Sequence, residues 1–284
     1  MEPLVTDLSI IIVSYNARAD LERCLASLHD PAPTISHELV VVDNASSDGS
    51  AEAAAWWPDV RVIESGANLG FAAANNIGIR ASVGEYLLLL NSDTVVPGGA
   101  IEGLMREMRR HPEAGAAGPR LVDAGGRPEL SFGRMISPLN ELRQRRLQRG
   151  LARHQAGALR RVEDMTRNTQ WPDWVSGACL LVRRHDAEAV GLLDERYFMY
   201  TEDVDFCAAL RARGRRILFT ASVEIVHLRG RSVATAPAVT HAAYRRSQLA
   251  FYEKHHPGLA PLLRLYVRWF GGADRQQETP GADK

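Results

Sequence analysis

The stretch EYLLLLNSD at residues 85–93 decides which class of fold this chain adopts. Its four consecutive leucines predict a strand that is buried on both faces, and the polar tip Asn91-Ser92-Asp93 follows at once. Strands buried on both faces are typical of parallel sheets, and open parallel sheets bind ligands beyond the carboxyl ends of their strands. An acidic side chain at that edge can hold a divalent cation against a phosphate, although Asn, Ser and Asp also form ordinary turns.

Three earlier segments repeat this arrangement. Apolar runs at residues 9–13, 38–42 and 60–63 each end in a polar cluster, and segments with helical patterns separate them. Alternating strands and helices predict β-α-β units with right-handed crossovers, so the carboxyl ends of these strands share one edge of one sheet. We therefore expect a binding crevice at that edge, lined by Asn16, Asp43, Asn68 and Asp93.

The crevice lacks the marks of the common nucleotide-binding loops. A dinucleotide site needs Gly-x-Gly-x-x-Gly directly after the first strand, where this chain has Ser-Tyr-Asn-Ala-Arg-Ala at residues 14–19. No Gly-Lys-Ser/Thr of a P-loop occurs, and no glycine-rich loop of a sugar-nucleotide pyrophosphorylase follows the first strand.

Composition is typical of an ordinary globular protein. The 284 residues suit one large domain, and the 34 basic and 34 acidic residues cancel, so nothing favours nucleic acid as a partner. Three scattered cysteines predict reduced, buried thiols in a cytoplasmic protein. We find neither the pattern of a signal peptide nor a run long enough to span a membrane.

Two segments depart from this average. Residues 139–167 carry eight arginines against three acids, which predicts a basic helix or mobile insert. Residues 259–270 (LAPLLRLYVRWF) mix large apolar side chains with two arginines. Both segments suit peripheral contact with an anionic membrane surface, but a solvated helix and a packed helix explain them equally well. Residues 271–284 are expected to be disordered.

The second half of the chain contains an acidic cluster. Residues 201–214 predict a helix that is capped by Thr201 and has Glu202, Asp203 and Asp205 in its first turn. A helix N-terminus stabilises a negative charge, so an acid there should stay ionised, as a general base requires. These acids could equally serve only to complement the helix dipole, and we favour that role for Asp205.

A lone histidine ends another predicted strand. In residues 223–232 the strand delivers His227, and Arg229, Arg231 and Ser232 follow. A single histidine is often structural, but its place after a strand and beside arginines also suits a metal ion or a diphosphate.

Taken together, the motifs resemble a known family. Their order and spacing resemble inverting family 2 glycosyltransferases with the GT-A fold, and the wording is most similar to a rhamnosyltransferase-like branch. The resemblance spans roughly residues 8–256. The motifs are IIVSYN (11–16), VVDNASSDGS (41–50), NLGFAAANNIGI (68–79), LLLLNSDTVVP (87–97), SGACLLVRR (176–184), FMYTEDVDFCAALRARG (198–214) and VHLRGRS (226–232).

The resemblance implies a donor site and a metal site. Asn91-Ser92-Asp93 stands where the family has Asp-x-Asp, whose last acid binds Mg²⁺ or Mn²⁺ on the diphosphate, so Asp93 is the main ligand. This chain departs from the pattern at Asn91, and His227 resembles the second metal ligand. The residues that match the nucleotide and diphosphate site are Ser14, Tyr15, Asn16, Asp43, Asn68, Gly70, Asn76, Gly78, Asn91, Ser92, Arg229 and Arg231.

The resemblance also implies the catalytic residues. Asp203 resembles the catalytic base, with Glu202 beside it, while Trp174, Gly177 and Ala178 match the loop near the donor sugar and the acceptor. A single base opposite the leaving group suffices for an in-line displacement with inversion.

The implied function is transfer of a sugar from a nucleoside-diphosphate sugar, with dTDP-rhamnose favoured, to an acceptor hydroxyl of a glycan or lipid-linked precursor. We expect one GT-A domain over residues 1–270, with a nucleotide half at 8–97, an acceptor half at 98–256 and a C-terminal helix at 257–270. Two rivals are a non-catalytic sugar-nucleotide-binding protein, which Asn91 would suit, and a nucleotidyltransferase. The sequence indicates no oligomeric state.

Overall fold

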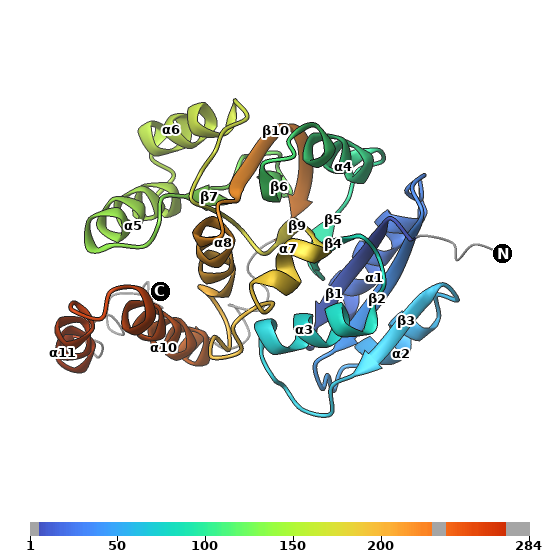
Figure 1. The fold of residues 1–284 in the computed structure, drawn as a ribbon, viewed down its shortest axis with the longest axis horizontal. Helices are drawn as coiled ribbons and strands as arrows, with labels where there is room; N and C mark the ends of the chain where they lie inside the picture. The colour runs from blue at the N-terminus through green and yellow to red at the C-terminus, as the bar shows by residue number, and fades with distance from the viewer. Residues whose placement is uncertain (1–5, 229–236, 271–284) are drawn as a thin grey trace, which may run out of the picture.

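The computed structural model describes residues 6–228 and 237–270. Within them, eight strands form one sheet in the order β3-β2-β1-β4-β9-β6-β10-β5, and β7 and β8 form a separate pair (Figure 1). The strands are β1 (Leu8–Ser14), β2 (His37–Asp43), β3 (Val60–Glu64), β4 (Tyr86–Asn91), β5 (Thr94–Val95), β6 (Ala114–Val122), β7 (Phe132–Gly133), β8 (Trp174–Val175), β9 (Cys179–Arg183) and β10 (Arg216–His227).

Helices cover both faces of the main sheet. Side chains alternate along each strand, so Ile10 and Ile12 of β1 join one core while Ile11 joins the other. Helices α1 and α4 pack on the first core, and α3, α7, α8 and α10 pack on the second. The helices are α1 (Arg18–His29), α2 (Ser50–Ala55), α3 (Phe71–Ala81), α4 (Ala100–Arg110), α5 (Pro138–Ala152), α6 (Ala156–Thr166), α7 (Arg184–Ala189), α8 (Glu202–Ala212), α10 (Pro237–His255) and α11 (Ala260–Phe270).

The four strands of the first half follow the sequence prediction. β3, β2, β1 and β4 are parallel, and β4 carries the leucine run with all four leucines buried. Their polar clusters therefore emerge at one edge of the sheet, as expected. The prediction of a mostly parallel sheet flanked by helices is confirmed.

Strand β9 joins the two halves of the chain. It lies in the interior of a largely parallel sheet, and it is antiparallel to both of its neighbours, β4 and β6. Because it runs opposite to β4, its first residue, Cys179, pairs with Leu90 near the end of β4. The start of β9 therefore lies at the same edge as the Asn91-Ser92-Asp93 tip.

Residues 139–167 form two helices, α5 and α6, rather than one basic helix or a mobile insert. Ser137 caps α5 by accepting a hydrogen bond from the amide of Asn140, and His154, in a left-handed conformation with φ 51°, separates the two helices. At the C-terminal end, residues Ala260–Phe270 form α11. No helix within residues 6–228 and 237–270 is long and apolar enough to cross a bilayer, and the predicted tail at 271–284 lies outside the described residues.

Candidate active site

The ends of β1 and β2 present two buried polar atoms at the sheet edge. Ser14 and Asp43 are almost inaccessible to solvent, and Ser14 Oγ and Asp43 Oδ1 have no hydrogen-bond partner among the described residues. The other carboxylate oxygen of Asp43 accepts from the amide of Ser46, at 2.9 Å. Buried polar atoms usually find a partner, so these two atoms suit a ligand that supplies one.

Tyr15 and Asn16 follow β1 at the same edge. Tyr15 is exposed, while Asn16 adopts a left-handed conformation and ties the β1 loop to the β2 loop. Its amide donates to Ser46 Oγ at 3.0 Å, and its side-chain oxygen accepts from the amide of Ser47 at 2.8 Å. Asn16 therefore shapes the loop around Asp43.

Asn44, which we did not single out from the sequence, holds the loop that carries Asn68 and Gly70. Its side-chain nitrogen donates to Asn68 Oδ1 at 3.0 Å, and its oxygen accepts from the amide of Leu69 at 2.9 Å. Gly70, with φ 84°, lies so close to Phe198 that a Cβ atom there would stand 2.2 Å from the Phe198 carbonyl oxygen. Asn68 and Gly70 are thus at the sheet edge, in contact with the segment that leads to α8.

Asn76 and Gly78 have packing roles in this structure. The buried Asn76 side chain donates to the carbonyl of Leu193 and to Glu195, both at 2.9 Å, and accepts from the amide of Leu193. A Cβ atom on Gly78 would stand 2.5 Å from Ile11 Cγ2, so the glycine lets α3 lie close to β1. Their assignment to the nucleotide site, which came from the resemblance, gains no support from these contacts.

Asp93, His227 and Glu129 form a chain of polar contacts in which His227 and Glu129 are buried. Asp93 Oδ1 lies 3.2 Å from His227 Nε2, and Glu129 Oε2 lies 3.0 Å from His227 Nδ1. The amide of Leu228 donates to the Asp93 carbonyl at 2.8 Å, which holds the end of β10 against the tip. The sequence separates these three residues widely, and the pairing of β5 with β10 brings two of them together.

The two carboxylates beside His227 raise the pKa of its imidazole ring. Burial lowers the pKa of His227, but hydrogen bonds and charge from Asp93 and Glu129 outweigh it and raise that pKa to about 9. Such a site favours a positive charge between the carboxylates. No group of three or more His, Cys, Asp or Glu side chains among the described residues is arranged to hold a metal ion. Asp93 and His227 could therefore hold a divalent cation only with further ligands from phosphate or water, and Glu129 would orient the His227 ring as carboxylates do around metal-bound histidines.

Asp203 lies close to the start of β9. The amide of Gly177 donates to Asp203 Oδ2 at 2.9 Å, and the amide of Val204 donates to Oδ1 at 2.8 Å. The next residue, Ala178, accepts at its carbonyl from the amide of Asn91 at 2.9 Å. The Gly177-Ala178 dipeptide therefore connects Asp203 with the Asn91-Ser92-Asp93 tip.

The carboxyls of Glu202 and Asp203 are less acidic than their place on α8 predicts. Burial, followed by the charge of Asp203, raises the pKa of Glu202 well above its usual value, and Glu202 Oε2 has no partner among the described residues. Burial also raises the pKa of Asp203, against the lowering effect of its two amide hydrogen bonds. The sequence predicts that an acid in this first turn stays ionised, but burial raises the pKa of both carboxyls and so acts against the helix dipole. Thr201 also makes no side-chain cap.

Asp205 makes structural contacts with α10, beyond the complement to the helix dipole that we favoured for it. It is buried and accepts from His255 Nε2 at 2.6 Å and from Lys254 Nζ at 2.8 Å, both on α10. The Tyr197 hydroxyl lies 3.2 Å from the same carboxylate. These contacts fix α10 against the first turn of α8.

Trp174, Arg229 and Arg231, which the sequence also assigns to the site, are not among the described residues that meet at this edge. The buried Trp174 ring donates its indole N–H to the carbonyl of Arg134 at 2.9 Å and packs on Gly133, so its contacts belong to the β7–β8 pair. Arg229 and Arg231 lie outside the described residues.

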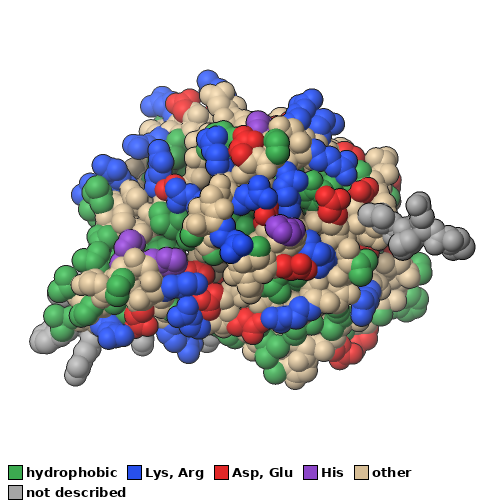
Figure 2. Space-filling view, in the orientation of Figure 1, with side chains coloured by type: hydrophobic (Ala, Val, Ile, Leu, Met, Phe, Trp, Pro, Cys, Tyr) green, Lys and Arg blue, Asp and Glu red, His purple; other side chains and the backbone are tan. Residues whose placement is uncertain are grey.

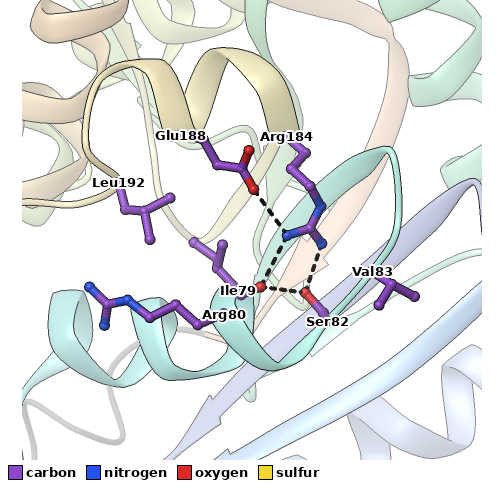
Figure 3. Close-up of a pocket in the computed structure, with 7 residues that line it drawn as sticks. All are labelled: Ile79, Arg80, Ser82, Val83, Arg184, Glu188 and Leu192. Carbon is purple, nitrogen blue, oxygen red and sulfur yellow. Dashed lines mark hydrogen bonds and ion pairs between the residues drawn. The ribbon is translucent and has the colours of Figure 1, made fainter.

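A surface hollow of about 500 Å³ lies at the opposite edge of the sheet (Figure 3). It is lined by Ser82 and Val83, which precede β4, whereas the Asn91-Ser92-Asp93 tip follows β4. Its main cation, Arg184, is occupied: it donates to the carbonyls of Gly84 at 2.6 Å and Ile79 at 3.1 Å. The hollow is therefore separate from the acidic edge.

Comparison with known proteins shows which family this chain belongs to. A family model described as Glycosyl transferase family 2 matches residues 9–165. An N-acetylglucosaminyl-diphospho-decaprenol L-rhamnosyltransferase of Mycobacterium tuberculosis is 34% identical over 275 residues, which cover 92% of this chain and 88% of the relative. This chain is a family 2 glycosyltransferase. The low-salt glycan biosynthesis hexosyltransferase Agl10 of Haloferax volcanii is 29% identical and covers 80% of this glycosyltransferase and 68% of its own length.

Solved structures of glycosyltransferases share the fold. The mannosyltransferase PcManGT from Pyrobaculum calidifontis, solved with GDP-Man and Mn²⁺, matches with a TM-score of 0.61 at 18% identity and covers 97% of this chain and 77% of its own. GalNAc-T7, solved with UDP, GalNAc and Mn²⁺, matches with a TM-score of 0.62 at 16% identity, over 99% of this chain and 53% of its own. The predicted GT-A fold is confirmed, and the family favours an enzyme over the non-catalytic alternative.

The contact between Gly70 and Phe198 gives a stability prediction for this glycosyltransferase. Gly70→Ala should lower the free energy of unfolding by about 2–4 kcal/mol, because the new Cβ meets a backbone oxygen and the backbone conformation disfavours alanine. Gly66→Ala is the matched control: its φ is also positive, at 75°, but nothing lies within 4 Å of a Cβ there. Gly66→Ala should lower the free energy of unfolding, measured in urea, by only about 1 kcal/mol. Equal losses would contradict the close approach of Phe198.

Proposed function

We propose that this glycosyltransferase moves a sugar from a nucleoside diphosphate to a hydroxyl of a lipid-linked glycan, with inversion at the sugar carbon. dTDP-rhamnose is the favoured donor, with UDP- and GDP-sugars as alternatives. The named L-rhamnosyltransferase relative supports both the sugar and the lipid-linked acceptor. We also propose that the protein acts in the cytoplasm, at the surface of a membrane.

The observation that carries this proposal is the link between the Asn91-Ser92-Asp93 tip and Asp203 through Gly177 and Ala178. A displacement with inversion needs leaving-group stabilisation on one side of the sugar carbon and a base on the other. The tip supplies the first and Asp203 the second, and two adjacent residues hydrogen-bond to both.

The proposed reaction is one displacement. The acceptor oxygen forms a bond to the sugar carbon, its proton passes to an Asp203 carboxylate oxygen, and the bond from that carbon to the diphosphate breaks. The Gly177 and Val204 amides hold the carboxylate in place. A divalent cation held by Asp93 and His227 would neutralise charge on the departing diphosphate. Mg²⁺ in proteins often uses only one or two carboxylates and takes its other ligands from phosphates and water.

Asp203→Asn should reduce transfer by at least about two orders of magnitude, because it removes the proton acceptor while keeping the size of the side chain. Donor affinity should change little. Glu202→Gln is the matched control: burial raises the pKa of Glu202 and so favours its neutral form, which the amide resembles, and turnover should change much less than in Asp203→Asn. An active Asp203→Asn variant beside an inactive Glu202→Gln variant would assign the base to the wrong acid.

The same base predicts the pH dependence of transfer. The base works when ionised, and burial raises the pKa of Asp203, so activity should fall, as pH is lowered, at a higher pH than an ordinary aspartate would give. A profile of kcat against pH measures this limb. Glu202→Gln should leave the limb in place, whereas an acid limb at the usual aspartate value would contradict the effect of burial.

Metal removal tests the role of Asp93, His227 and Glu129. EDTA should abolish transfer and Mg²⁺ or Mn²⁺ should restore it. Glu129→Gln should weaken Mn²⁺ binding roughly tenfold, measured by titration of the bound ion, because the ring of His227 loses its charged partner. Glu224→Gln changes an exposed residue on β10, the strand that carries His227, and should leave the Mn²⁺ affinity unchanged. Full activity in EDTA would shift leaving-group stabilisation to Arg229 and Arg231.

Nucleotide binding tests the donor class. A ligand that binds only the folded protein raises its melting temperature, so a screen of nucleoside diphosphates with Mn²⁺ ranks the bases directly. We expect dTDP to give the largest increase. Asp43→Asn should reduce the preference among bases, since it changes the buried carboxylate at the end of β2. A larger increase with GDP would replace dTDP-rhamnose as the favoured donor.

A further inference from the structure

Exposed leucines concentrate at one end of the molecule. Among the described residues, nine large hydrophobic side chains are exposed, and five of them lie on α5 or at and just before α11. These five are Leu139, Leu142, Leu259, Leu262 and Leu265. Figure 1 shows α5 and α11 at the same end of the ribbon, with α10 next to α11.

The helix α11 separates a packed side from an exposed side. Ala260 is buried and Leu263 packs against the core that contains α10, whereas Leu262 and Leu265 are 65% and 56% exposed. Residues three apart share a face of a helix, so Leu262 and Leu265 form one apolar strip that points away from the core. A solvated helix would place polar residues there.

Arginines lie beside the leucines on α5. Arg143, Arg146 and Arg149 are exposed and are spaced so that they continue the face begun by Leu139 and Leu142. Figure 2 shows basic side chains gathered over α5 and α6, at the same end of the molecule as the hydrophobic side chains over α11. The whole chain has no net charge, so this positive surface is a local feature.

The acids of this region do not neutralise the surface. Glu141 turns towards α10 and accepts from the Tyr252 hydroxyl at 2.7 Å, and Glu163 pairs with Arg120 of β6 at 3.0 Å. Asp164 pairs with Arg167. Six exposed arginines are left with no ion pair to a described residue: Arg143, Arg146, Arg149, Arg153, Arg160 and Arg161.

We propose that α5, α6 and the exposed strip of α11 form a docking surface for an anionic lipid bilayer. Leucines beside a basic face are the features by which amphipathic helices lie in the interface of a membrane, where arginines meet lipid phosphates. Charge selects the occupant: a hydrophobic partner protein or a second copy of this chain would match the leucines but not six arginines that form no ion pair with a described residue. The surface deepens the proposed function, since a lipid-linked acceptor is presented at a bilayer.

Flotation with lipid vesicles tests the surface without any reaction. The full-length protein should float with vesicles of phosphatidylcholine and phosphatidylglycerol at low salt, and less at high salt. Each arginine contributes about fivefold near an anionic surface, so Arg143→Gln/Arg146→Gln/Arg149→Gln should weaken binding about a hundredfold. Arg106→Gln/Arg109→Gln/Arg110→Gln is the matched control, because it removes three exposed arginines from α4 and should leave binding unchanged.

A second pair of variants tests the leucines. Leu262→Ser/Leu265→Ser should weaken flotation, whereas Trp56→Ser/Val83→Ser removes two exposed apolar side chains elsewhere and should have no effect. Equal binding to vesicles of phosphatidylcholine alone would overturn the role of the arginines. A leucine variant that floats normally but changes the oligomeric state in size-exclusion chromatography would assign the strip to a second copy.

Transfer to a water-soluble acceptor analogue separates this surface from the proposed function. The triple α5 variant should keep wild-type transfer to that analogue while losing vesicle binding. Wild-type protein that floats but transfers no sugar would leave the docking surface standing and overturn the proposed function. Wild-type protein that transfers sugar but does not float on anionic vesicles would overturn the docking surface and leave the proposed function standing.

Discussion

The antiparallel strand β9 is the constraint on which the active site depends. It lies between β4 and β6 and runs against both, so its start meets the end of β4. A parallel strand at this place would begin at the far edge of the sheet. Because of the reversal, the residues just before β9 accept a hydrogen bond from Asn91 and donate one to Asp203. The two halves of the chain therefore meet at the candidate site through two adjacent residues, Gly177 and Ala178.

The sequence predicts the features that depend on a few neighbouring residues, and it does not predict those that depend on contacts between distant residues. The strands that end in Ser14, Asp43 and Asn91 follow from apolar runs a few residues long, and the sheet edge follows from them. Glu129 could not be found this way, because it follows the turn-forming run Gly125-Gly126-Arg127-Pro128 and its importance comes from contact with His227, 98 residues away. Asn44 adjoined a predicted site residue, but only the folded loop shows that its amide holds Asn68 and Leu69.

The acids on α8 show why an argument from the helix dipole was insufficient. A helix N-terminus favours a charged carboxylate by roughly 0.3–1 kcal/mol at an exposed site. Burial of a carboxyl group without compensating hydrogen bonds costs more, and three neighbouring acids meet different degrees of compensation. Asp205 has a lysine and a histidine, Asp203 has two amides, and Glu202 has an oxygen with no partner among the described residues. All three acids lie in the first turn of α8, so the helix dipole acts on them similarly. The different hydrogen-bond partners around each carboxyl group therefore distinguish them.

One helix, α10, connects the proposed membrane surface with the helix that carries Asp203. Tyr252 of α10 donates to Glu141 of α5, and α11 packs on the same helix. Two and three residues further along, Lys254 and His255 bind Asp205, which follows Asp203 by two positions on α8. These are short, buried or half-buried contacts rather than a flexible linker. If α5 and α11 rest on a bilayer, the protein itself therefore fixes the height and orientation of Asp203 above the lipid, and the acceptor hydroxyl has to reach the proposed base at that place.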